Sequence, residues 1–173
     1  MCSINYRIKS ILLNTLFSIS ILCSVFNINY TLAEDFLLEF TGKAETKGFS
    51  FSDNSSYKLY TSEGYWKSSF GDYGKNSCFG DITKNSLEAI NLELICQLQS
   101  KDGSIAWQKV TRNSESQKAG VGQVIFFDGT KRLTNLVGVT CTHAVTYVED
   151  AYFVMQKCKA PDSVLEVLKK FNN

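Results

Sequence analysis

The stretch "VTCTHAVTYVEDAYFVMQKC", residues 139–158, places two cysteines on either side of an acidic turn and carries the chain's only histidine. Its first half belongs to a pattern that runs from Val137 to Tyr147. There, apolar side chains, Cys141 and His143 alternate with Gly, Thr and Ala. A period of two is typical of a β-strand with one buried face. We therefore predict a strand in which His143 shares a face with Cys141.

The second half of the stretch predicts the partner strand. If Cys141 lies opposite Cys158, antiparallel pairing matches residues whose numbers share one sum, and similar side chains then face each other. The loop left over, residues 148–151, has a common hairpin length. The other inward pairs are His143 with Gln156, Val145 with Val154, and Tyr147 with Tyr152.

A second cysteine pair passes the same test. The segment "INLELICQL" (90–98) alternates, and placing Cys78 opposite Cys96 leaves the five-residue loop "NSLEA". An even number of cysteines in an exported chain favours disulfides over a metal site. We predict two disulfides, Cys78–Cys96 and Cys141–Cys158, each worth roughly 3 kcal/mol on the loop-entropy model.

The N-terminal segment predicts export to the periplasm or beyond the cell. Arg7 and Lys9 precede an apolar stretch at 11–28, and "TLA" ends at Ala33, as in a cleaved signal peptide. An uncleaved membrane anchor is the alternative, diluted by polar residues. We expect a signal peptide at 1–33 and a single domain at 34–173, which would not contact the membrane after cleavage.

Further short aromatic segments separated by Gly, Asp, Asn or Ser bring the expected strand number to about eight. The fold class is therefore all-β, an antiparallel barrel of six to eight strands that leaves no exposed edge. After Pro161, a capping box at Ser163 and Glu166 and an apolar stripe that reaches Phe171 predict one short C-terminal helix. The additional strand segments are residues 35–42, 47–52, 57–71, 104–112 and 120–128.

The segment "KDGSIAWQKVTRNSESQKAGVGQVIFFDGTKRLTNLVG", residues 101–138, has a recognisable order of turns. It contains a D-G turn at 102–103, a G-V-G segment at 120–122, a G-T turn at 129–130 and a closing Gly138. This order resembles small exported bacterial proteins of the allene oxide cyclase-like barrel group, near dirigent proteins and calycin barrels. Lys131, Leu133 and Asn135 depart from that group's last turn. The resemblance implies a lumen that holds an apolar ligand, and it transfers no catalytic residue.

Several classes of chemistry have no support in the sequence. The mature chain is nearly balanced in charge and has no basic run, which argues against a nucleic-acid partner. There is no G-x-S-x-G, C-x-x-C or H-E-x-x-H, so we expect no catalytic triad and no metal. The segment at Gly120 lacks the third glycine of a dinucleotide fingerprint, and we expect no cofactor. We interpret Gly120 and Gly122 as giving backbone room in a bent strand.

The acidic residues near strand ends offer a further candidate site. Paired carboxylates would suit sugar hydrolysis, but no spacing selects a pair, and solvated turn positions account for them. These residues are Asp72, Asp81, Glu88, Glu93, Asp102 and Asp128.

The remaining polar and aromatic candidates point to a ligand site in the lumen. His143 and Gln156 are either a mutually hydrogen-bonded core pair or, with Tyr147 and Tyr152, lumen groups that orient a ligand. Trp66 belongs to an aromatic group, residues 57–73, that either packs in the core or lines a ligand-stacking mouth. Arg112 either binds a carboxylate-bearing ligand or forms a surface ion pair.

We therefore expect an exported barrel that binds a small, mainly apolar molecule without catalysing a reaction. One alternative is a cyclase- or isomerase-like enzyme whose lumen shapes its substrate, with His143 or a buried carboxylate as acid or base. Another is a structural envelope protein with a filled core. The volume of the lumen distinguishes these three hypotheses.

Overall fold

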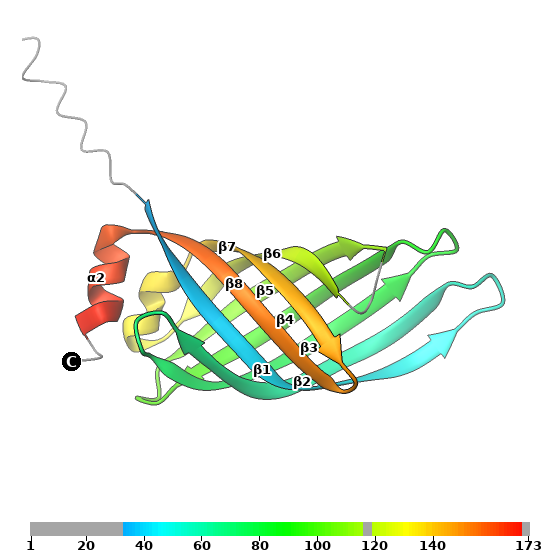
Figure 1. The fold of residues 1–173 in the computed structure, drawn as a ribbon, viewed down its shortest axis with the longest axis horizontal. Coiled ribbons are helices and arrows are strands. Elements are labelled where there is room, and N and C mark those ends of the chain that lie inside the picture. Colours follow the sequence, from blue (N-terminus) through cyan, green and yellow to red (C-terminus); the bar gives the residue numbers. More distant parts are fainter. Residues whose placement is uncertain (1–32, 116–118, 171–173) are drawn as a thin grey trace, which may run out of the picture. The chain divides into compact units, whose positions relative to one another are not determined.

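The computed structural model is an eight-stranded antiparallel barrel, closed by the pairing of the first strand with the last (Figure 1). It describes residues 33–115 and 119–170. The expected signal peptide, apart from Ala33, and Phe171 lie outside this range. The strands are β1 (Ala33–Ser50), β2 (Ser56–Ser68), β3 (Tyr73–Lys84), β4 (Ile90–Ser100), β5 (Ile105–Ser114), β6 (Ala119–Gly129), β7 (Thr140–Val148) and β8 (Ala151–Pro161).

The two hairpins expected around the cysteines are confirmed. Cys78 pairs with Cys96 on β3 and β4, and Cys141 pairs with Cys158 on β7 and β8, and both pairs are disulfide-bonded. The inward register of β7 and β8 is also the expected one, with His143 opposite Gln156. The turn between β7 and β8 is shorter than expected, because residues 148 and 151 still pair and only two residues connect them.

The first two predicted strands, 35–42 and 47–52, are one strand, β1. The glycine that suggested a break, Gly42, lies opposite Gly64 of β2. A Cβ at position 42 would stand 2.8 Å from the Tyr152 hydroxyl oxygen, and one at position 64 would stand 2.5 Å from it. These glycines therefore allow a close approach inside a continuous strand instead of ending it.

One end of the barrel is closed by two helices (Figure 1). A 3-10 helix, η1 (Lys131–Leu136), follows β6 and was not predicted from the sequence. The C-terminal helix, α2 (Asp162–Lys170), was predicted and packs on η1, β1 and β8. Leu133 and Leu136 of η1 and Leu165 and Leu168 of α2 are buried there. We call this the closed end, and the opposite end, which carries the β1–β2, β3–β4 and β7–β8 turns, the open end.

An ion cluster anchors η1 to the closed end. Arg132 donates hydrogen bonds to Asp72 Oδ2 (2.6 Å) and to Asp102 Oδ2 (2.7 Å), both of which lie in or beside turns. Ser100 accepts from the same guanidinium and donates to Asp72 (2.9 Å). Burial alone would raise the pKa of Asp102, but hydrogen bonds from Arg132 and Ser104 outweigh it and lower that pKa. The expectation of a solvated turn residue was therefore wrong for Asp72, which is buried, whereas Asp102 is an exposed turn residue that also pairs with Arg132.

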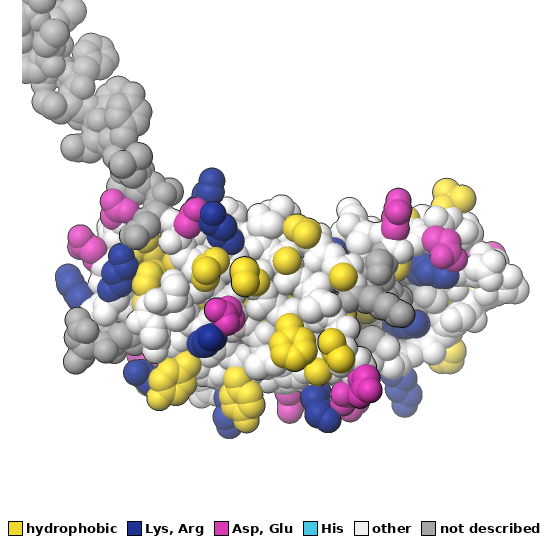
Figure 2. Space-filling model, viewed as in Figure 1, with side chains coloured by type: hydrophobic (Ala, Val, Ile, Leu, Met, Phe, Trp, Pro, Cys, Tyr) yellow, Lys and Arg dark blue, Asp and Glu magenta, His cyan; other side chains and the backbone are white. Residues whose placement is uncertain are grey.

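Much of the aromatic group at 57–73 faces outward. Tyr57, Tyr65 and Tyr73 are exposed on the outer surface, whereas Tyr60 and Trp66 are buried. Figure 2 shows hydrophobic side chains scattered over one face of the barrel among charged ones. The group therefore does not form a single stacking surface at the mouth of the barrel.

Removing a disulfide should destabilise the barrel. We expect Cys141→Ala with Cys158→Ala to lower the free energy of unfolding by about 3 kcal/mol, because the unfolded chain gains the entropy of an open loop. Urea unfolding under non-reducing conditions measures this, and the matched pair Cys78→Ala with Cys96→Ala should lose a similar amount. A tryptic map that links Cys141 to Cys78 or Cys96 would contradict the observed pairing.

Replacing Arg132 should be costlier than replacing a surface cation. Arg132→Met leaves the buried Asp72 carboxylate without its charged partner, and we expect a loss of about 3–5 kcal/mol. The control is Lys109→Met, which breaks an exposed ion pair with Glu93 and should cost at most about 1 kcal/mol. Equal urea midpoints for the two variants would show that the cluster does not anchor η1.

Candidate functional site

A cavity of about 50 Å³ lies in the barrel lumen and is partly open. Its walls combine aliphatic side chains with polar groups that converge from different strands. No acidic side chain and no lysine is among the lining residues. They are Phe40, Tyr60, Ser62, Asn76, Cys78, Leu92, Leu94, Cys96, Gln108, Val110, Arg112, His143, Val145, Tyr147, Tyr152, Val154 and Gln156.

Arg112 is the only residue in this lining whose side chain is charged at neutral pH. It lies near the open-end terminus of β5, faces inward like Val110, and is 3% exposed. Its Nε and Nη1 atoms have no hydrogen-bond partner within the described part of the chain. No Asp or Glu of that part forms an ion pair with it. The surface ion pair considered for Arg112 is therefore wrong.

The two glycines of the G-V-G segment on β6 make room for the site. A Cβ at position 120 would stand 2.7 Å from Arg112 Cδ, and one at position 122 would stand 2.5 Å from His143 Cε1. Any larger residue at these positions would displace one of the two side chains. The motif was expected to give backbone room in a bent strand, and the room that it gives is occupied by the side chains of Arg112 and His143.

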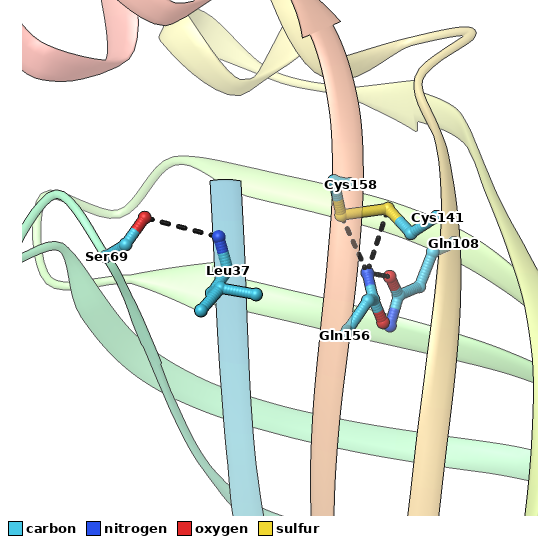
Figure 3. The surroundings of a disulfide bond; sticks show 6 residues. All are labelled: Leu37, Ser69, Gln108, Cys141, Gln156 and Cys158. Carbon is cyan, nitrogen blue, oxygen red and sulfur yellow. Dashed lines mark hydrogen bonds between the residues drawn. A yellow bond between two sulfur atoms is a disulfide. The ribbon is translucent and has the colours of Figure 1, made fainter. Parts of the chain in front are cut away.

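His143 lies opposite Gln156, but the two are not a mutually satisfied pair. Gln156 Nε2 donates instead to Gln108 Oε1 across the lumen (3.0 Å) and lies 3.3 Å from Cys141 Sγ (Figure 3). His143 is 4% exposed, and its Nδ1 has no partner among the residues that the structure describes. The core-pair interpretation was therefore wrong, and His143 keeps one ring nitrogen for another group.

The ionisation of His143 follows from its surroundings. Burial first, and then the nearby Arg112 charge, lower the pKa of His143 to about 4. The imidazole is consequently neutral at pH 7. A neutral imidazole offers one N–H donor and one acceptor, so it can bind a polar group without adding charge.

The tyrosines of the lumen are hydroxyl donors and acceptors. The Tyr147 hydroxyl lies 3.4 Å from that of Tyr60, and Asn76 Nδ2 donates to the Tyr152 hydroxyl (2.9 Å). Burial raises the pKa of Tyr60 and of Tyr152. Both phenols are therefore protonated at neutral pH. Sequence reasoning did not identify Tyr60 as a lumen residue. The signal that could have found it is the alternation of Tyr60 with its neighbours Leu59 and Thr61 along the strand.

Trp66 does not join the other candidates. It is buried beside the closed end, where it lines a gap of about 20 Å³ with Leu98 and Leu136. The structure thus brings together His143, Gln156, Tyr147, Tyr152 and Arg112, and it places Trp66 elsewhere.

A larger hollow of about 640 Å³ lies on the outer surface across β2, β1, β8 and β7. Its outward-facing walls include Tyr65, Phe153 and Met155, and its charged residues, Glu39 and Lys67, pair with each other (3.0 Å). It contains no buried polar atom in need of a partner other than the Trp66 Nε1 beneath it. The lumen cavity is therefore the better candidate for a site.

Over residues 33–115 and 119–170, no group of three His, Cys, Asp or Glu side chains is placed to hold a metal ion. Neither does any helix of this part have the length and hydropathy needed to cross a membrane.

The comparisons with known proteins support the fold alone. No protein-family model and no curated protein matches the chain. A solved conserved protein of unknown function from Rhodopseudomonas palustris is similar in structure, with a TM-score of 0.59 and 13% identity over 74% of this chain and 98% of its own. An enzyme from Penicillium herquei is also similar, with a TM-score of 0.52 and 16% identity over 76% of this chain and 99% of its own.

Acid should destabilise the fold through His143. Between pH 6.5 and about 4, the unfolded chain binds a proton at this histidine and the folded chain does not, so the free energy of unfolding falls as the pH falls. The full effect is about 3 kcal/mol. We expect His143→Gln to remove this component, giving a shallower loss of stability over that window in urea titrations. Identical pH slopes for the two proteins would contradict a neutral buried histidine.

Proposed function

We propose that the chain is an exported binding protein that holds a small molecule in its barrel lumen. The observation that carries this proposal is the lumen cavity, in which buried polar atoms of Arg112 and His143 lack partners beside an aliphatic wall. Buried polar groups are nearly always hydrogen-bonded in native proteins. A few converging polar groups against an apolar wall are typical of small-molecule sites.

The size of the cavity limits the ligand. Sites for drug-sized ligands measure about 300–1,000 Å³, whereas this cavity measures about 50 Å³. We therefore propose a ligand of a few heavy atoms, or one small end of a larger molecule that reaches out of the open end. The aliphatic side chains Leu92, Val110 and Val154 would contact its apolar part. The ligand we propose carries a polar group as well as an apolar part, since about half of the lining residues have polar side chains.

An oxidising compartment is part of the same proposal. Both disulfides connect neighbouring strands of the barrel, and structural disulfides of this kind are typical of periplasmic and secreted proteins. The resemblance of residues 101–138 to allene oxide cyclase-like barrels is consistent with this placement and with a lumen ligand.

A cyclase- or isomerase-like activity is the second candidate. His143 favours it, because a buried imidazole that is neutral at pH 7 and unpartnered at Nδ1 could accept a proton from a lumen substrate. The filled-core alternative describes the closed end, where only a gap of about 20 Å³ remains, but it does not account for the unpartnered atoms of Arg112.

Native mass spectrometry of the protein purified from its own compartment tests the proposal. We expect a co-purifying small molecule in the wild type and its loss in Val154→Phe, which adds volume to the cavity wall. The matched control is Met155→Phe on the outer face of the same strand, which should retain the molecule. Equal retention by both variants would place the ligand outside the lumen, and a wild type without any bound molecule would count against a carrier.

A further inference from the structure

We propose that the lumen ligand is a monovalent carboxylate, which Arg112 binds through its guanidinium and His143 contacts through its ring. This inference rests on the proposed function and names the chemical class of its ligand. It follows from the charge of the lumen, from the donors that Arg112 leaves unpaired, and from the space that β6 reserves around them.

Arg112 carries a buried positive charge. Arginine stays protonated in proteins, and a buried charge is costly unless an opposite charge and hydrogen bonds compensate it. Arg112 is 3% exposed, and its Nε and Nη1 have no partner within residues 33–115 and 119–170. No acidic residue lines the cavity. An anionic ligand supplies the missing opposite charge.

The closed end of the same barrel provides an internal comparison. Arg132 is also buried, and there the chain supplies two carboxylates, from Asp72 and Asp102, within 2.7 Å of its nitrogens. The fold thus neutralises a buried arginine where its role is to hold a helix in place. At Arg112 no such carboxylate is provided, and the geometry points to a carboxylate that comes from outside the chain.

The lining favours a monovalent carboxylate over a phosphate. A guanidinium presents N–H donors in a planar fork that matches a carboxylate. Only one cation faces the cavity, because His143 is neutral at pH 7, so a dianion would retain an uncompensated buried charge. The aliphatic wall formed by Leu92, Val110 and Val145 suits the carbon chain of an organic acid.

The two inward glycines of β6 give the site its shape. A side chain at position 120 would contact Arg112, and one at position 122 would contact both His143 and the Thr111 carbonyl oxygen. The strand therefore leaves both polar side chains room to lie in the lumen on the same side. Two donors, from β5 and β7 on either side of β6, can then meet the two oxygens of one carboxylate.

Butyrate and its neutral isostere butyramide are suitable probes, since both are small and differ in charge. The sequence has three arginines and one histidine, so arginine Nε–H and histidine ring resonances are few enough to follow by NMR. We expect butyrate to shift the Arg112 Nε–H and His143 signals saturably at pH 7. The Arg132 Nε–H, already bonded to Asp102, should stay unchanged and serves as the internal control.

Substitutions of Arg112 distinguish the effect of its charge from the effect of the cavity's shape. We expect Arg112→Met to weaken butyrate binding about 10- to 100-fold, as loss of a charge-assisted hydrogen bond implies, and to leave butyramide binding within about twofold. Lys109→Met, on the outer face of the same strand, is the matched control and should leave both unchanged. If Arg112→Met does not fold, Arg112→Lys keeps the charge without the planar fork and should still bind butyrate more weakly than the wild type.

The outcomes are distinguishable. Butyramide binding as tightly as butyrate to the wild type, or butyrate shifting Arg132 and not Arg112, would overturn the carboxylate proposal and leave a lumen ligand of another class. If neither probe binds the wild type at millimolar concentration, the proposed binding function itself fails for ligands of this size. Selective butyrate binding that is lost with the Arg112 charge supports the inference.

Discussion

The pairing of β1 with β8 is the constraint on which the rest of the structure depends. It closes the sheet, so every strand has two hydrogen-bonded neighbours and alternate side chains must enter one lumen. An eight-stranded barrel of this kind has an interior that side chains nearly fill. Large inward side chains therefore need small residues beside them. Gly42 and Gly64 provide this room around Tyr152, and Gly120 and Gly122 provide it around Arg112 and His143.

Each half of the lumen contains a buried arginine, and the two halves differ in whether residues of the chain supply the opposite charge. At the closed end, Asp72 and Asp102 neutralise Arg132, and this cluster fixes the 3-10 helix over the barrel. Toward the open end, Arg112 faces tyrosines, amides and a neutral histidine. In the first arrangement the chain itself supplies the opposite charges, and the cluster is structural. In the second, no residue that the structure describes offers Arg112 a negatively charged hydrogen-bond acceptor, which is why we propose a function for that half.

Much of this architecture could be predicted from periodicity. The alternation around Cys141 and around Cys96 gave both hairpins and both disulfides, because cysteines can pair directly across two strands only when the register is right. Alternation also places Arg112 on the face of Val110. This signal was enough to identify Arg112 as a lumen residue, but its position near a strand end suggested a surface ion pair instead. Three features could not be predicted from the sequence. Gly42 resembles a strand break in sequence, the 3-10 helix has no clear periodic signal, and the Gln156–Gln108 bond joins strands that are not neighbours.

That bond across the lumen explains why His143 remains available. Gln156 faces His143 in the register, yet its amide is held by Gln108 and lies against the Cys141–Cys158 disulfide, which the barrel wall positions. The histidine is thereby left with an unpartnered nitrogen, while burial and Arg112 keep it neutral. Neutral His143 avoids repulsion with Arg112 and can still donate a hydrogen bond. One permanent positive charge surrounded by neutral donors would stabilise a bound anion without competition from an acidic residue of the cavity lining, and this is the physical basis of the carboxylate selectivity that we propose.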